Sequence, residues 1–294
     1  MKQHILLILL ILLCSSVFKL FAQTKTITTG LQHPESIISD GKFFYASNIG
    51  GALSPMTKDG DGSIYKLSLD GKLIEQRFNK GVLNAPKGTA IVNGVLYVAD
   101  IDRVVGVDLR TGEQVKEIDL ASFGTSFLND IAVKDETTLF VGSIDVSKIF
   151  VITLSNPARI EVLDVPEIKS PNGLYYNKPT NQLFFVELVR NDLLQGRIGV
   201  IDWDKDNHPK MTYLSDLKGN YDGLQMIDRN TLLVSDWYNF KEQKCRLIKV
   251  DIAQKKATPF LDDVDAADIL YDQQQKRFII PGLCKGTIST LTIH

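Results

Sequence analysis

Six positions in this chain recur at intervals of 42 to 52 residues, each at the start of a short apolar segment. They are Glu35, Lys87, Asn129, Asn172, Asp222 and Ala267. Four of the six offer side-chain oxygens, with no sulfur or imidazole among them: Glu35, Asn129, Asn172 and Asp222. Calcium prefers six to eight oxygen ligands and tolerates irregular geometry, whereas zinc prefers nitrogen or sulfur. The set predicts a divalent cation site, most simply for Ca²⁺, with positions left open for water and substrate.

A simpler explanation exists for these residues, because Asn and Asp before Gly are common turn formers that cap strands. For any one of the positions taken alone, turn chemistry is a better explanation than metal binding. It does not explain four oxygen donors at equivalent repeat positions, and it does not call for Glu35. The pattern as a whole therefore favours a metal site, in which Asp222 is the candidate catalytic base for an attacking water.

Two further side chains are candidates for contact with a substrate. Lys87 could hold a substrate carboxylate or stabilise an oxyanion, and it could equally balance the charge of Glu35, Asp222 and Asp100. Trp237 stands at the end of a predicted strand, where it would wall the pocket or pack between neighbouring sheets. Both alternatives are open for each residue at this point.

The repeat length sets the elements that must position these residues. A period of 42 to 52 residues fits four short antiparallel strands with their turns. Runs rich in Val, Ile, Thr and Phe alternate over four to seven residues and end at Gly, Asn, Asp or Pro, as strands do. The last repeat is one strand short, and residues 24–29 can supply the missing strand. We therefore expect an all-β protein, a six-bladed β-propeller closed by N- and C-terminal strands, with residues 23–294 forming one domain.

Composition and the N-terminal sequence bear on the partners of the protein and on its location. The chain has 294 residues and a formal net charge of −2, and no basic run suggests nucleic acid as a partner. Lys2, an apolar run from Ile5 to Leu13 and a small residue at Ala22 predict a signal peptide over residues 1–22. The mature protein is then periplasmic or secreted and not membrane-bound; an uncleaved anchor or a lipid anchor at Cys14 fits the sequence less well.

Two cysteines remain after this cleavage. Cys245 and Cys284 fall in neighbouring repeats, so they could form a disulfide or remain two buried thiols. The sequence does not decide between these alternatives.

The motifs resemble those of a known group of propellers. Pro171-Asn172-Gly173, Asn129-Asp130-Ile131, Asp222-Gly223 and Glu35 occur in the order seen in the gluconolactonase, regucalcin (senescence marker protein) and paraoxonase-like superfamily. The resemblance implies that Glu35, Asn172 and Asp222 bind a catalytic divalent metal, usually calcium. It implies that Asn129 is a further ligand or contacts substrate, and that the reaction is hydrolysis of a lactone or related ester.

Three departures from that resemblance matter. Phe127 stands where regucalcin-like enzymes have an arginine, which argues against recognition of a sugar lactone. Lys87 stands where paraoxonases have a histidine, and Ser36 replaces an aspartate of their second calcium site, so a second calcium is not expected although Asp130 matches. Two functional hypotheses follow: a calcium-dependent hydrolase of a small lactone or ester, and a non-catalytic propeller of the cell envelope that binds a ligand or protein. A ring with a purely structural role is a third possibility.

Overall fold

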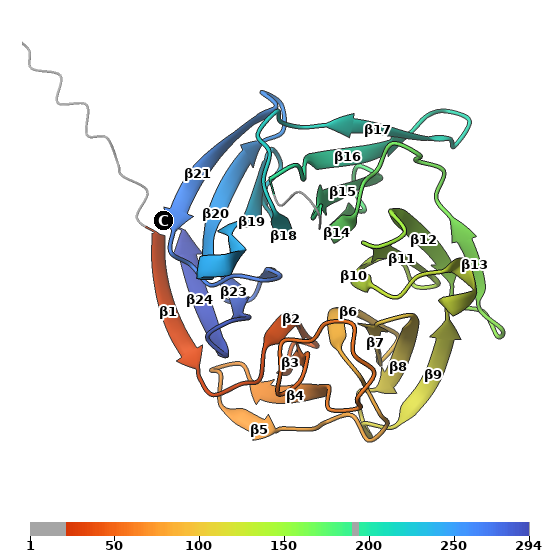
Figure 1. The fold of residues 1–294 in the computed structure, drawn as a ribbon, viewed down its shortest axis with the longest axis vertical. Helices are drawn as coiled ribbons and strands as arrows, with labels where there is room; N and C mark the ends of the chain where they lie inside the picture. The colour runs from red at the N-terminus through yellow and green to blue at the C-terminus, as the bar shows by residue number, and fades with distance from the viewer. Residues whose placement is uncertain (1–21, 190–193, 294) are drawn as a thin grey trace, which may run out of the picture.

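Each sequence repeat forms one four-stranded antiparallel sheet, and six such sheets surround a central channel (Figure 1). The structure, a computed structural model, describes residues 22–189 and 194–293. The predicted all-β six-bladed propeller is confirmed. The predicted signal peptide lies outside the described residues except for Ala22. Within the described residues, no helix is long and apolar enough to cross a membrane.

The six sheets, or blades, follow one another along the chain. Blade 1 contains β2 (Pro34–Ser39), β3 (Phe43–Asn48), β4 (Ser63–Ser68) and β5 (Leu73–Glu75). Blade 2 contains β6 (Pro86–Val92), β7 (Val95–Asp100), β8 (Arg103–Asp108) and β9 (Gln114–Asp119). Blade 3 contains β10 (Leu128–Asp135), β11 (Thr138–Ser143), β12 (Lys148–Thr153) and β13 (Arg159–Val162). Blade 4 contains β14 (Pro171–Asn177), β15 (Gln182–Glu187), β16 (Ile198–Trp203) and β17 (Pro209–Tyr213). Blade 5 contains β18 (Tyr221–Asp228), β19 (Thr231–Asn239), β20 (Lys244–Asp251) and β21 (Lys256–Asp262). Two short 3-10 turns, η1 (Ala121–Phe123) and η2 (Phe240–Glu242), are the helical elements in the described residues.

Blade 6 is built from both ends of the chain. It contains β22 (Leu270–Asp272), β23 (Arg277–Gly282) and β24 (Thr287–Ile293), and its outermost strand is β1 (Ala22–Thr28). Strand β1 pairs antiparallel with β24, from Ala22 opposite Ile293 to Thr28 opposite Ile288. This confirms the predicted closure, in which strands from the two ends of the chain complete one sheet.

The hydrophobic core lies between neighbouring blades, because each sheet packs its apolar faces against the next. Leu128, Val141 and Phe150 of blade 3, for example, pack with Val104 and Ala99 of blade 2 in one buried cluster. A fully buried side chain of this size contributes roughly 2 kcal/mol relative to an exposed one. The first strand of each blade lies innermost in the ring (Figure 1), so its first residues face the channel.

A β-bulge interrupts the pairing of the inner strands where the predicted site residues lie. In blade 4 the register jumps between Pro171 and Leu174, which leaves Asn172 and Gly173 outside the regular ladder. The inner strands of blades 1, 2, 3 and 5 have the same interruption after their first residue. Bulges redirect side chains and disrupt pairing. The repeated motif is thus a bulge inside a strand, and the turn interpretation of Asn172-Gly173 and Asp222-Gly223 is wrong.

A carboxylate at the end of the second strand fixes the loop that enters the inner strand in three blades. Asp100 accepts hydrogen bonds from the backbone N–H groups of Asn84 and Ala85, each at 2.9 Å, and pairs with Arg103. Glu187 accepts from the N–H groups of Lys169 and Arg197 at 2.9 and 3.1 Å.

In blade 5, Asp236 plays the same part. It accepts from the N–H of Asn220 at 3.0 Å and pairs with Arg246 at 2.9 Å. The anchored loops lead directly to Lys87, Asn172 and Asp222, so buried ion pairs and hydrogen bonds hold the approach to each of these residues.

The two cysteines of the described chain are not joined. Cys245 is buried and donates its thiol hydrogen to the carbonyl of Ala266, at an Sγ–O distance of 3.3 Å, and Cys284 is partly buried. The sequence left open a disulfide or two thiols, and in the structure Cys245 and Cys284 are free thiols.

Candidate metal centre in the channel

The predicted site residues converge at one end of the channel, where a cavity of about 190 Å³ opens. Its polar lining consists of Glu35, Lys87, Asn129 and Asp222, and Trp237 forms part of its wall. Asn172 is fully buried and in contact with Asp222. The bulged inner strands of five blades thus bring five of the predicted site residues together, and β19 adds Trp237. Ala267 of blade 6 is buried and offers no polar side-chain atom.

Asn172 and Asp222 form a fixed pair. The Asn172 Nδ2 group donates to Asp222 Oδ1 at 3.0 Å and to the backbone carbonyl of Tyr221 at 2.9 Å. Trp237 Nε1 donates to Asp222 Oδ2 at 2.9 Å. Because two acceptors hold the amide nitrogen, the amide orientation is determined and Asn172 Oδ1 is left buried without a hydrogen-bond partner.

Burial dominates the electrostatics of the carboxyl groups. It raises the pKa of Asp222 to about 6, although the hydrogen bonds from Trp237 and Asn172 act in the opposite direction. Burial raises the pKa of Glu35 well above its usual value, and the negative charges of Asp222 and Asp268 add to this. Glu35 is 5% exposed, and its Oε2 atom has no hydrogen-bond partner. Such a group is costly to ionise unless a cation lies beside it.

Lys87 is the cation that the chain itself places in this cavity. It is 1% exposed, donates from Nζ to the carbonyl of Ala85 at 2.8 Å, and lies 5.3 Å from the ring centre of Phe127. Burial lowers the pKa of Lys87 to about 8, while the charges of Glu35 and Asp100 raise it. The charge-balance interpretation is supported for Glu35 and Asp100, and the position of Lys87 in the cavity lining also leaves it able to contact a ligand.

A second tier of acids lies one residue further along the inner strands. Asp130 Oδ2 accepts from the N–H of Leu174 at 2.6 Å, and Asp268 Oδ2 accepts from Ser36 Oγ at 2.7 Å. Burial, followed by the charge of Asp268, raises the pKa of Asp130, and burial raises the pKa of Asp268 to about 6. From the sequence, Ala267 was placed at the sixth ring position, and Asp268 was not identified as a site residue. The one sequence signal for Asp268 was the match of Ala266-Ala267-Asp268 to the other strand starts.

Glycines allow the inner strands to approach one another at this level. A Cβ atom on Gly173 would lie 2.2 Å from the backbone oxygen of Asp222, and one on Gly223 would lie 2.5 Å from the Cα of Asp268. The channel narrows here to a gap with no room for a water molecule, and beyond it a second cavity of about 240 Å³ opens at the opposite end. The glycines that follow Asn172 and Asp222 therefore serve close packing.

The donor set fits a hard divalent cation. Glu35 and Asp222 supply carboxylate oxygens, Asn129 and Asn172 supply amide oxygens, and two buried oxygens, Glu35 Oε2 and Asn172 Oδ1, lack partners. Four acidic side chains lie in this part of the channel: Glu35, Asp130, Asp222 and Asp268. Among the described residues, Lys87 is the one basic side chain that lines the cavity. A bound Ca²⁺ would satisfy the two oxygens and offset this charge.

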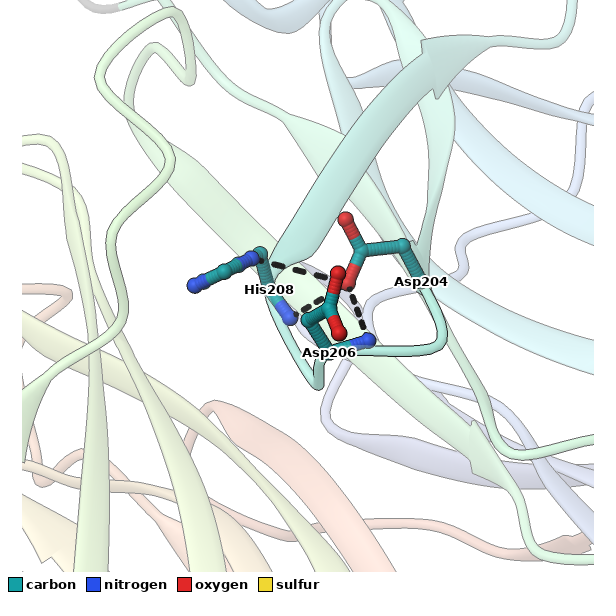
Figure 2. A group of neighbouring side chains, drawn as sticks. All are labelled: Asp204, Asp206 and His208. Carbon is teal, nitrogen blue, oxygen red and sulfur yellow. Dashed lines mark hydrogen bonds and ion pairs between the residues drawn. The ribbon is translucent and has the colours of Figure 1, made fainter.

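A different cluster of potential ligands lies on the outside of the ring, in the hairpin between β16 and β17 (Figure 2). Ligand atoms of Asp204, Asp206 and His208 all lie within 4.8 Å of one another, and no other such group of His, Cys, Asp or Glu occurs in the described residues. Asp204 Oδ1 already accepts from the backbone N–H groups of Asp206 and His208, each at 2.9 Å. Asp206 and His208 are exposed, so the cluster is explained as the bonding of a tight hairpin.

Comparison with solved structures places the fold in context. No family model and no curated protein matches the chain. A gluconolactonase from Xanthomonas campestris aligns with a TM-score of 0.66 at 14% identity, over 93% of this chain and 90% of that one. Virginiamycin B lyase from Staphylococcus aureus aligns with a TM-score of 0.63 at 14% identity, over 94% and 100%.

The similar structures also include the extracellular part of a signalling protein. The extracellular domain of a putative one-component system from Bacteroides thetaiotaomicron aligns with a TM-score of 0.60 at 10% identity, over 92% of this chain and 40% of that one. Neighbours this diverse at such low identity establish a shared fold and leave the reaction to be argued from the site. The expected resemblance to gluconolactonase-like propellers is confirmed at the level of the six-bladed fold.

Proposed function

We propose that this protein is a calcium-dependent hydrolase that acts on a lactone or related ester at the channel mouth. The observation that carries the proposal is the pair of buried, unpartnered oxygens, Glu35 Oε2 and Asn172 Oδ1, beside the carboxylate of Asp222. Leaving such atoms unpaired costs roughly 1 to 3 kcal/mol each, and a bound cation removes that cost. A likeness to a gluconolactonase structure supports the same reaction class.

The residues can be assigned roles from their contacts. A divalent cation held by Glu35, Asn129, Asn172 and Asp222 would polarise the carbonyl oxygen of the substrate. Asp222 is held by hydrogen bonds on both oxygens, which fix the carboxylate in position to accept a proton from the attacking water. Lys87 places an ammonium group in the same cavity, where it can stabilise negative charge on the substrate oxygen.

Histidine-based chemistry has less support in this cavity. One similar structure is a catalytically inactive virginiamycin B lyase in which a histidine is replaced by alanine. Among the described residues of this chain, no histidine lines the cavity: His33 bonds through Nδ1 to the carbonyl of Gly50, and His208 lies in the outer hairpin. Proton transfer by a carboxylate is therefore the assignment that the cavity favours.

The test is hydrolysis of a panel of lactones and aryl esters before and after removal of divalent ions. We expect a chelator to abolish turnover and added calcium to restore it, and Asp222→Asn to lower kcat at least about 100-fold. Asp204→Asn in the outer hairpin is the matched control and should behave as the unaltered protein does. Turnover that survives chelation would refute the metal mechanism. Calcium binding without turnover of any panel member would favour the alternative, a non-catalytic ligand- or protein-binding propeller.

A further inference from the structure

The cavity at the channel mouth is divided into a polar floor and an apolar wall. The floor holds Glu35, Lys87, Asn129 and Asp222. The wall is formed chiefly by six side chains from the surrounding loops: Leu53, Pro55, Phe127, Leu188, Phe240 and Leu283. The reacting group of a ligand must meet the floor, and the remainder of the ligand must lie against the wall.

Leu53 and Pro55 come from the long loop between β3 and β4, and this loop is fixed where it leaves and rejoins the blade. His33 Nδ1 bonds to the carbonyl of Gly50 at 3.0 Å, and the N–H of Gly51 donates to Asp61 at 2.9 Å. Further along the loop, Lys58 forms an ion pair with Asp102 of blade 2. The apolar wall is therefore held in place on the side where this loop crosses the mouth.

The side chains of this wall offer almost nothing for a polar ligand to bind. Leucine, proline and phenylalanine side chains carry no hydrogen-bond donor or acceptor. Among the described residues of the wall, the indole N–H of Trp237 is the one polar side-chain group, and it is already donated to Asp222 at 2.9 Å. A ligand with several hydroxyl groups would lose its hydrogen bonds to water here without replacement by side chains. A ligand with a hydrocarbon substituent would gain from burial against the same surface.

We infer that the site takes lactones or esters whose non-reacting part is an alkyl or aryl group, and that it discriminates against polyhydroxylated lactones. This inference rests on the proposed function, because it concerns the same cavity and the same reacting bond. The volume of about 190 Å³ suits a small ring with a short substituent, since drug-sized ligands occupy pockets of about 300 to 1,000 Å³. The ligand class therefore differs from the sugar lactone that a gluconolactonase neighbour suggests.

The experiment compares two six-membered lactones that differ only in their substituents, δ-octanolactone and D-glucono-1,5-lactone, with the calcium-loaded protein. Each kcat/KM is divided by the rate constant for alkaline hydrolysis of the same lactone, which removes the difference in intrinsic reactivity. We expect the corrected ratio to favour δ-octanolactone at least about 100-fold, the discrimination that one unpaired hydroxyl can produce. A ratio of one or below would overturn the inference and leave the proposed hydrolase function standing.

A wall variant gives a second measurement. Leu53→Asn keeps the size of the side chain and adds an amide, so the corrected ratio should fall about tenfold. Val82→Thr is the matched control, because Val82 is 60% exposed and does not line the cavity, and the ratio should not change. An unchanged ratio in Leu53→Asn would count against a specificity role for this wall.

Binding of a non-hydrolysable analogue separates failure of the inference from failure of the proposed function. The lactam that corresponds to δ-octanolactone should change the fluorescence of Trp237 saturably. If the lactam binds and neither lactone is hydrolysed, the hydrolase proposal fails and the apolar ligand class is upheld. If D-glucono-1,5-lactone is hydrolysed and the lactam does not bind, the inference fails and the hydrolase proposal is upheld. If neither hydrolysis nor binding occurs, both are overturned.

Discussion

Two groups of potential metal ligands in this molecule, one in the outer hairpin and one in the channel, differ in their surroundings. In the outer hairpin, Asp204, Asp206 and His208 lie closer together than any other such group in the described residues. Asp204 accepts backbone hydrogen bonds on Oδ1, and the hydrogen bond from His208 N–H is the main cause of its lowered pKa. Its charge is stabilised by the chain itself, so a cation has little left to contribute.

The channel residues show the opposite features. Burial raises the pKa of Glu35 and of Asp222, and Glu35 Oε2 and Asn172 Oδ1 have no hydrogen-bond partner. The chain thus brings ionisable groups and oxygen lone pairs together in the channel without supplying enough hydrogen bonds or positive charge to stabilise them. The comparison therefore favours the channel over the outer hairpin as the proposed metal site, because the channel holds buried oxygens that lack hydrogen-bond partners.

The largest effect that can test this contrast is the pH dependence of stability in the metal-free protein. The pKa of Asp222 is about 6 in the folded protein against a usual value near 4, so its contribution to stability is fully present below about pH 4 and is lost as pH rises through about 6. For Asp222 alone the loss is on the order of 3 kcal/mol. Thermal unfolding in a chelator should give a lower Tm at pH 7.5 than at pH 5.

Two controls sharpen this prediction. Excess calcium should reduce the difference in Tm between the two pH values, because it stabilises the ionised carboxylates. Asp222→Asn should reduce it as well, whereas Asp204→Asn should not, since the lowered pKa of Asp204 acts in the opposite direction. A metal-free Tm that rises from pH 5 to pH 7.5 would contradict the raised pKa values in the channel.

The next effect in size is on calcium affinity. Glu35→Gln keeps the shape of the side chain and removes one of the two ligand charges, so we expect the Kd for calcium to rise about 100-fold, or about 2.7 kcal/mol. Calorimetric titration measures it directly. Asp204→Asn should leave the Kd within about twofold; a large effect there, with none in Glu35→Gln, would move the site to the outer hairpin.

Close packing between inner strands predicts a somewhat smaller effect. In Gly173→Ala the new Cβ would lie 2.2 Å from the Asp222 backbone oxygen, so the free energy of unfolding should fall by about 2 kcal/mol. Gly94→Ala is the control in the hairpin between β6 and β7, where a Cβ meets no atom within 4 Å and the positive φ of 78° costs about 1 kcal/mol. Denaturant unfolding compares the two. Equal losses would mean that the inner strands have more freedom than their contacts indicate.

The smallest effect concerns the indole that holds Asp222. Trp237→Phe preserves an aromatic side chain and removes the hydrogen bond to Asp222 Oδ2, so calcium affinity should fall about tenfold. Trp203→Phe is the matched control, because Trp203 packs against Phe140 of blade 3. The same titration serves for both variants, and an equal response in Trp203→Phe would show that the loss arises from general destabilisation.

The repeat pattern was sufficient to predict the fold and to place the six ring positions. Strand starts 42 to 52 residues apart determine the number of blades, and the short last repeat indicates closure by residues near the N-terminus. These features follow from local patterns of apolar residues and turns. The structure therefore confirms them with small changes of boundary, such as β1 at Ala22–Thr28.

The sequence was a poorer guide wherever function depends on contacts between blades. Asn172-Gly173 has the composition of a turn, and only the approach of the Asp222 backbone shows why glycine is needed inside that strand. Asp268 escaped notice because Ala267 took the aligned position. The unpartnered state of Glu35 Oε2 depends on packing from several blades, and no spacing rule reports it.

The pairing of β1 with β24 has a consequence for how the protein is made. The N–H of Asp268 in blade 6 donates to the carbonyl of Glu35 in blade 1, so the two blades that meet at the closure also meet at the proposed metal centre. Because blade 6 needs strands from both ends of the chain, it cannot assemble until synthesis has reached the final strand. A nascent chain thus carries the proposed cation ligands in an open arc, and their complete arrangement arises in the last step of folding.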